Sequence, residues 1–246
     1  MIAGGRGREW TAESRIGLGD EKGLDYQSKG AIAVGRKWLI LGLVIGLSFL
    51  VIGGAAAREL RVPGDYSTIQ DAVDASQDGD VILIAPGFYS GFAVVEKANL
   101  TILGTGSDPE SVVISGTVLI KDSASITLST LMITGDGNGV EIDGEIRTLT
   151  IQNCWLIRNE LSGIVFLPTA VYEDVKLLDC MVRYNGYDGV VLGGRGREVL
   201  LQGNDISFNG RATPTGCGIR VGQELQSTVI SDNIIVGNPF AGIHPQ

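Results

Sequence analysis

The feature that most constrains the fold is a repeat in the second half of the chain. Four segments align with one another, and each ends in asparagine: LTIQNCWLIRN, VKLLDCMVRYN, VLLQGNDISFN and TVISDNIIVGN. Their last residues are Asn159, Asn185, Asn209 and Asn238, so successive copies lie 26, 24 and 29 residues apart. A copy this short cannot bury its apolar residues alone. It must therefore stack on its neighbours, as solenoid repeats do.

The pattern within each copy indicates strands. Apolar residues alternate with polar ones, as at Leu149 and Ile151 or at Val175 and Leu177, and such alternation is typical of a strand with one buried face. Bends follow at asparagine or glycine, which tolerate left-handed backbone conformations. Each strand would then pair with its equivalent one coil away, at about 4.8 Å. The pattern predicts a parallel β-helix.

Residues at equivalent positions of the coils should form columns. We interpret Asn159, Asn185, Asn209 and Asn238 as a structural ladder of side-chain amides that bond along the axis. Cys154 and Cys180 are also equivalent. They predict either a stacked pair of core thiols or a disulfide between coils.

The segment before the repeats has the features of an entry to the coil. Ser67 and Gln70 have the spacing of a helix capping box. Ile69 and Val73 would form an apolar stripe over one end of the core, and residues 81–84 would be the first strand of the coil. We expect a short helix that covers the N-terminal end of the stack.

These patterns resemble a known superfamily. The N-x-I-x-x-N-x-x-x-G-I repeat, together with the entry segment VPGDYSTIQDAVDAS at 62–76, resembles the right-handed parallel β-helix proteins of the pectin-lyase-like superfamily. The repeats are similar to those of its periplasmic accessory and carbohydrate-active members. The resemblance covers about residues 60–246 and implies an all-β solenoid of about seven coils with a short capping helix. The superfamily contains lyases, hydrolases, esterases, epimerases, adhesins and accessory proteins, so it implies no single activity.

The catalytic motifs of these enzymes are not found in the sequence. The Gly-Arg-Pro-Trp motif of pectin methylesterases, the Gly-His-Gly motif of polygalacturonases and the Asp-Pro-His-Asp motif of alginate epimerases all fail to match, and the one histidine is His244. A lyase site of calcium-binding carboxylates with an arginine or lysine base has no compact signature, so whether the chain is an enzyme stays open. Calcium is the cofactor expected of a lyase. No CxxC motif or histidine cluster predicts another metal.

Four side chains are candidates for substrate binding. Arg220 and His244 each lie two residues after a repeat glycine, in a column expected to face outward one coil apart. Arg183 and Tyr187 lie near the bend of an earlier coil, and an insertion at 211–215 should lie beside that bend. We interpret these residues as a sugar contact or, for Arg220 and His244, an acid–base pair. The alternative is ordinary solvated side chains.

The N-terminal part has a different character. Residues 38–57 contain no charged residue and are long enough to span a bilayer. The excess of Lys and Arg before them places the N-terminus in the cytoplasm. Residues 1–37 are then a disordered cytoplasmic tail or the product of a misassigned start. Residues 38–57 are either a transmembrane anchor or a signal peptide cleaved near Ala57, and residues 58–246 form the exported domain.

The charge and the end of the chain suggest partners. Residues 58–246 carry 12 basic and 23 acidic side chains, which disfavours a nucleic-acid partner. No cap follows the last repeat, so we expect end-to-end self-association, a missing C-terminal partner or a truncated reading frame. The leading hypothesis is an exported β-helix module that contacts polysaccharide or cell envelope. A polysaccharide lyase or related carbohydrate-active enzyme and a structural or adhesive surface protein are the alternatives.

Overall fold

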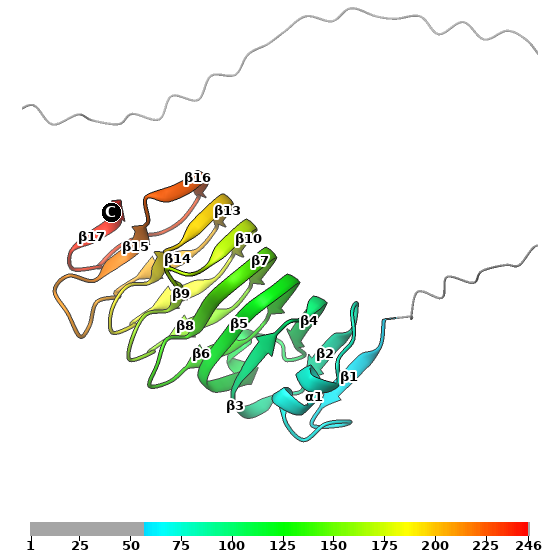
Figure 1. Cartoon of the computed structure of the whole chain (residues 1–246). Helices are drawn as coiled ribbons and strands as arrows, with labels where there is room; N and C mark the ends of the chain where they lie inside the picture. Colours follow the sequence, from blue (N-terminus) through cyan, green and yellow to red (C-terminus); the bar gives the residue numbers. More distant parts are fainter. Residues whose placement is uncertain (1–56, 246) are drawn as a thin grey trace, which may run out of the picture. The chain divides into compact units, whose positions relative to one another are not determined.

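The chain folds into a stack of parallel coils. A computed structural model describes residues 57–245, and within them 17 strands wind into about eight turns of a right-handed parallel β-helix (Figure 1). The expected tail at 1–37 and the expected membrane or signal segment at 38–57 lie outside the described residues, Ala57 excepted. Among the residues described, no helix combines the length and the hydropathy of a membrane span.

Each coil contributes to three parallel sheets, which we call sheets A, B and C. Sheet A contains β1 (Glu59–Val62), β2 (Val81–Ile84), β4 (Ala98–Gly104), the last part of β5 (Val112–Ser129), the last part of β7 (Val140–Gln152), β10 (Val171–Leu178), β13 (Arg195–Gln202) and β16 (Glu224–Ser231). The strand β1 pairs in parallel with β2. It therefore adds a rung before the strand at 81–84 that the sequence takes as the first.

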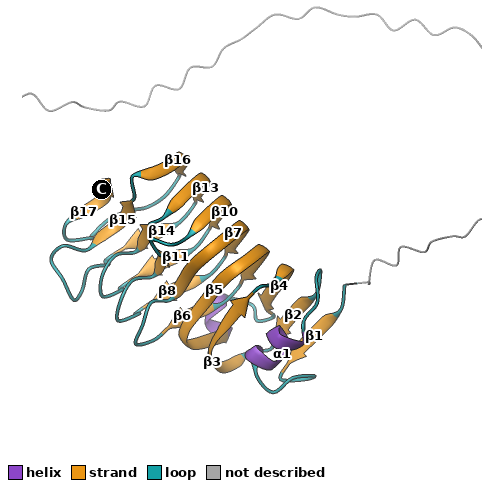
Figure 2. Ribbon diagram, in the orientation of Figure 1, coloured by secondary structure: helices purple, strands orange, loops and turns teal. Residues whose placement is uncertain are grey.

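Sheets B and C continue the same coils. Sheet B contains the first parts of β3 (Gly87–Val95) and β5, then β6 (Met132–Thr134), β8 (Trp155–Ile157), β11 (Met181–Arg183) and β14 (Asp205–Ser207). Sheet C contains the end of β3, the middle of β5, the start of β7, then β9 (Ile164–Phe166), β12 (Val190–Leu192), β15 (Cys217–Val221) and β17 (Ala241–Pro245). Figure 2 shows how loops join the three sheets at the corners of the stack.

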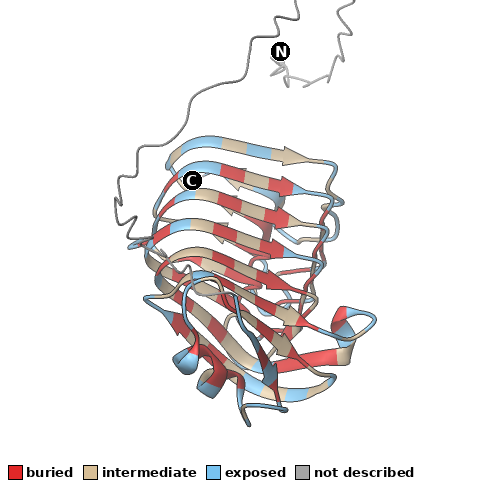
Figure 3. Ribbon diagram, turned by 90° about the vertical axis from the view of Figure 1, so that its right-hand side faces the viewer, coloured by how far each residue is buried: buried red, intermediate tan, exposed pale blue. Residues whose placement is uncertain are grey.

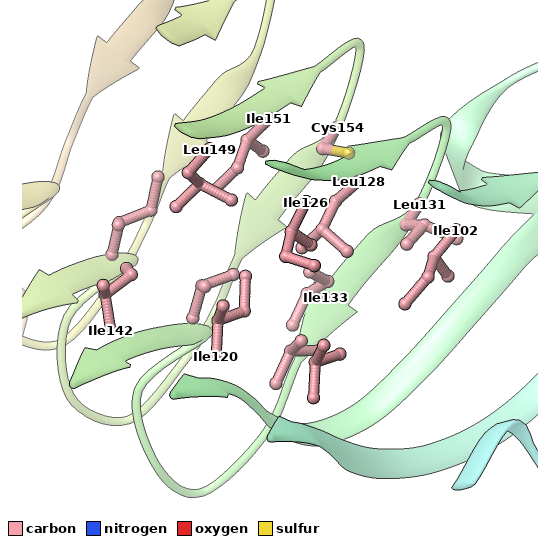
Figure 4. Packing of buried hydrophobic residues seen from close by; sticks show 14 of the residues in the cluster. Ile102, Ile120, Ile126, Leu128, Leu131, Ile133, Ile142, Leu149, Ile151 and Cys154 are labelled. Atoms are coloured by element: carbon pink, nitrogen blue, oxygen red, sulfur yellow. The ribbon is translucent and has the colours of Figure 1, made fainter. Parts of the chain in front are cut away.

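The core consists of inward-facing aliphatic side chains at equivalent positions. Ile126 lies beside Leu149, and Leu128 lies beside Ile151, in the paired strands β5 and β7. Figure 4 shows these residues stacked along the interior, and each is at most 2% exposed. Burying one such side chain stabilises the fold by about 1.5–3 kcal/mol. The alternation seen in the sequence is therefore the pattern of this core.

A short helix, α1 (Ile69–Ala75), packs against β1, β2 and β3. Ile69, Ala72 and Val73 are its buried residues. The capping box expected at Ser67 is wrong by one residue, because Thr68 is the N-cap and its side chain accepts a hydrogen bond from the N–H of Asp71. The other short helix in the described part is a single 3-10 turn, η1 (Pro109–Ser111).

The asparagine ladder runs along the corner after sheet B. The Oδ1 of Asn185 accepts hydrogen bonds from the backbone N–H and the side-chain amide of Asn159, and Asn209 and Asn238 repeat the arrangement in the next coils. Each side-chain amide also donates to a main-chain carbonyl of the preceding coil. These residues thus satisfy backbone groups at a corner where no strand pairing does so.

A second ladder runs along the corner before sheet B. Asn204 accepts a hydrogen bond from the N–H of Cys180, and Asn233 accepts two from Asn204. In the preceding coil the Sγ of Cys180 takes the acceptor position for the N–H of Cys154, at 3.4 Å. Cys154, Cys180 and Cys217 are all buried free thiols. Of the two arrangements open at the sequence level, the stacked thiols are therefore the one observed.

Packing is looser in the last coil. Ile219 is fully buried, whereas its register partner Ile243 is 46% exposed. Figure 3 shows the same trend, because buried positions give way to intermediate and exposed ones at this end. The strands β16 and β17 each pair with a strand on one side only within residues 57–245.

Candidate functional site

The four residues singled out in the sequence lie on different parts of the surface. Arg183 is on β11 of sheet B, and Tyr187 is in the turn that leads to sheet C. Arg220 and His244 are register partners on β15 and β17 of sheet C. The structure thus aligns Arg220 with His244 one coil apart.

Arg220 forms a partly buried ion pair. Its Nε donates to Oδ2 of Asp188 at 2.8 Å, and one terminal nitrogen donates to Oδ1 at 2.8 Å. The same terminal nitrogen donates to the carbonyl of Thr215 in the inserted loop, at 3.0 Å. The Asp188 carboxylate also accepts the backbone N–H of Cys217 and raises the pKa of the Arg220 guanidinium. Arg220 therefore holds the loop at 211–215 against the coil.

Arg183 belongs to an aromatic cluster. Its guanidinium lies 5.6 Å from the ring centre of Tyr184 and 5.4 Å from that of Phe208. The two rings stack at 5.5 Å, because each residue has the same left-handed backbone conformation in successive coils. The next equivalent residue is Gly237, where the Phe208 ring occupies the space of a side chain. This geometry stabilises the Arg183 cation by cation–π contact.

His244 and Tyr187 have fewer contacts. His244 lies edge-on to Phe240, with ring centres 5.0 Å apart, and Tyr187 is exposed. None of the four candidates lines either of the two hollows described next. Their role as sugar contacts stays a prediction.

A hollow follows the corner between sheets C and A. One part has a volume of about 570 Å³ and the next about 470 Å³, and the two share Val171 and Glu173. We call them together the corner groove. Its lining comes from the same corner of successive coils, at residues 96–98, 122–124, 145–147, 171–173, 195–197 and 223–226. The groove therefore runs along the axis of the stack.

The floor of the corner groove is apolar. Ile146 and Tyr172 are almost fully buried and stack in register at its base. The hydroxyl of Tyr172 donates to the carbonyl of Gly193 at 2.9 Å. Burial raises the pKa of Tyr172, so its hydroxyl stays protonated. Leu225 extends this floor toward the last coil.

The rim of the corner groove alternates in charge. Glu173 lies between Arg147 and Arg197 in the stack. Its carboxylate is 3.9 Å from Arg197, and Glu224 is 3.8 Å from Arg195. All four of these paired side chains are more than half exposed. Because exposed ion pairs contribute little free energy, these side chains can give up their pairing and contact a ligand instead.

The sequence did not single out these residues. They fall between the aligned repeat segments, and only the register of the coils brings them into one line. One signal was available in the sequence. Arginine and glutamate recur near the start of the sheet A strand in several consecutive repeats, and this recurrence could have pointed to the groove.

No cluster of metal-binding side chains is evident among residues 57–245. No three His, Cys, Asp or Glu side chains within residues 57–245 lie close enough together to hold an ion. Calcium binding at a lyase-type site stays a prediction.

Comparison with known proteins agrees with this architecture. A family model described as the right-handed beta helix region matches residues 99–245. The chain belongs to this right-handed β-helix family. No curated protein matches the sequence.

Solved structures share the fold at low identity. An alginate lyase from Paenibacillus sp. str. FPU-7 superposes with a TM-score of 0.61 and 14% identity, over 76% of this chain and 74% of that one. The pectate lyase Pel9A gives 0.50 and 15%, over 75% and 65%. A pectin methylesterase variant in complex with a hexasaccharide gives 0.46 and 13%, over 78% and 66%.

Proposed function

We propose that this chain is a polysaccharide-binding β-helix module that holds a linear polymer in the corner groove. The proposal rests on the shape and lining of the groove. Its two parts adjoin at Val171 and Glu173 and together extend over several coils, with apolar side chains beneath a rim of hydrogen-bonding side chains.

This combination suits a sugar polymer. A pyranose ring has apolar C–H faces and hydroxyl groups around its edge. Val171, which is 37% exposed, and the partly exposed Leu225 offer apolar surface for the faces. Carboxylates of the rim accept hydrogen bonds, and guanidiniums donate them. A ligand cleft typically has such a mostly apolar lining with a few polar groups.

Two further points support the choice of ligand. Successive rungs lie about 4.8 Å apart, which is close to the length of one sugar unit, so equivalent side chains can meet successive units. The similar solved structures include an alginate lyase and a pectate lyase, enzymes that act on polysaccharides. We further propose that the module works outside the cytoplasm, where such polymers occur. The apolar segment at 38–57 would direct its export, either as a membrane anchor or as a signal peptide.

The test is binding by the full-length chain to a panel of polysaccharides, measured by affinity electrophoresis and calorimetry. We expect Arg147→Ala combined with Arg197→Ala to weaken binding at least tenfold. Arg61→Ala is the matched control, since Arg61 is exposed, forms an ion pair with Glu59 and lies outside the groove. Unchanged binding in the double variant would contradict the assignment of the groove.

The same panel separates the alternative functions. Appearance of unsaturated sugar products, seen by ultraviolet absorbance, would make the chain a lyase. Absence of both binding and cleavage would leave a structural or adhesive surface protein.

A further inference from the structure

The charges of the corner groove bear on which polysaccharide it accepts. Its lining contains five carboxylates and four cationic side chains among the described residues: Glu96, Asp122, Glu145, Glu173 and Glu224 against Lys97, Arg147, Arg195 and Arg197. The groove therefore has no net positive charge to offer.

The cationic side chains are also partly committed. The ammonium of Lys97 donates to the carbonyls of Asp74 and Ser76, at 3.2 and 3.1 Å. Arg197 and Arg195 each face a glutamate of a neighbouring coil. Arg147 is the one arginine of the groove without an ion pair in the described part, and it lies in register beside Glu173.

A polymer of uronic acids would meet repulsion along this line. Each of its carboxylates would enter a groove where glutamates recur from coil to coil, and like charges at such distances oppose binding. The whole of residues 58–246 is also acidic, with 23 acidic against 12 basic side chains. The long-range field therefore repels an anionic polymer as well.

A cationic polymer would be attracted by the glutamates of the rim but repelled by its arginines. The guanidiniums of Arg147, Arg195 and Arg197 lie on the same rim as the glutamates. An uncharged polymer avoids both kinds of repulsion. It can also use both kinds of side chain, because a hydroxyl donates to a carboxylate and accepts from a guanidinium.

From this we infer that the corner groove selects an uncharged polysaccharide and rejects polyuronates; the inference rests on the proposed function. The alternating rim provides the hydrogen bonds, the exposed apolar surface of Val171 and Leu225 contacts the sugar faces, and the excess of carboxylates provides the discrimination.

The experiment measures the binding of four polymers to the full-length chain: galactan and xyloglucan, which are uncharged, polygalacturonate, which is anionic, and chitosan, which is cationic. We expect an uncharged polymer to bind at least tenfold more tightly than either charged one. That binding should change little between 20 and 500 mM salt, because no charges are neutralised.

A variant with three carboxylates neutralised makes the test sharper. The triple variant carries Glu145→Gln, Glu173→Gln and Glu224→Gln. We expect its affinity for polygalacturonate to rise at least tenfold and to fall with increasing salt, as for an anion bound to cationic side chains. Glu59→Gln, at an exposed residue outside the groove, is the control and should leave the affinity for polygalacturonate unchanged.

The outcomes are distinct. Preferred binding of polygalacturonate or chitosan by the unaltered chain would overturn the selectivity and leave the proposed function standing. No gain for polygalacturonate in the triple variant would also overturn it. Failure of every polymer to bind would overturn the proposed function and the inference with it.

Discussion

Asn185 accepts two hydrogen bonds from Asn159 at a single side-chain oxygen, one from the backbone N–H at 3.0 Å and one from the amide at 2.9 Å. Both residues are at most 1% exposed. The amide of Asn185 in turn donates to Leu156 and to Asn209. One side chain thus connects three coils of the stack.

Replacement of Asn185 should therefore be costly. Asn185→Ala leaves buried donors of Asn159 without an acceptor, and each such group costs about 1–3 kcal/mol. We expect the free energy of unfolding to fall by at least about 2 kcal/mol, measured by urea denaturation. Asn238→Ala, in the more open last coil, should cost clearly less because water reaches the orphaned groups. Equal losses would contradict this account.

The ion pair of Asp188 with Arg220 should matter for the inserted loop. Asp188→Ala leaves a largely buried guanidinium and the N–H of Cys217 without their acceptor. We expect a loss of about 3 kcal/mol, together with faster proteolysis within 211–215. Arg195→Ala removes an exposed arginine and should cost less than about 1 kcal/mol. A loss below that level in Asp188→Ala would show that the pair is not structural.

Acid should weaken the junction of Arg58 with Asp80. Arg58 and backbone N–H groups lower the pKa of the Asp80 carboxyl to about 2. A pKa lowered by folding stabilises the protein above the unfolded value of about 4, and the contribution is lost as the pH falls toward 2. The stability difference between the unaltered chain and Asp80→Asn should thus be largest above pH 4 and shrink toward pH 2. A difference independent of pH would exclude this linkage.

The thiols should be inert in the folded protein. Cys154, Cys180 and Cys217 are buried, and burial raises the pKa of Cys180 and of Cys217, which lowers the thiolate fraction. We expect iodoacetamide at pH 8 to label none of them within an hour and all three in denaturant, as read by intact mass. Rapid labelling without denaturant would show local opening of the coils.

The sequence predicted the parts of the fold that repeat. The alternation of Leu149 with Ile151 and the four aligned asparagines are local patterns, and the β-helix follows from them because each coil repeats the environment of the previous one. The strand β1 was missed because it has no repeat partner of similar sequence. The second ladder was missed because Asn204 and Asn233 are aligned with Cys180, and an amide and a thiol do not look equivalent in sequence.

The corner groove could not be predicted in the same way. Arg147, Glu173 and Arg197 become neighbours only through the register of strands that are 24 to 26 residues apart in the chain. Arg220 was placed in a column expected to face outward, and in the structure it is partly buried in an ion pair with Asp188. The ion pair itself was not predicted, because Asp188 lies in the turn of the preceding coil and only the stacking of the coils brings it to Arg220.

Because the corner groove is built from the same corner of every coil, its length is tied to the number of coils. Duplication of one repeat would lengthen it by about 4.8 Å without altering the chemistry of the existing rungs. The surface proposed to bind a polymer can thus be lengthened by copying a unit of about 25 residues, while point changes at the rim alter its charge.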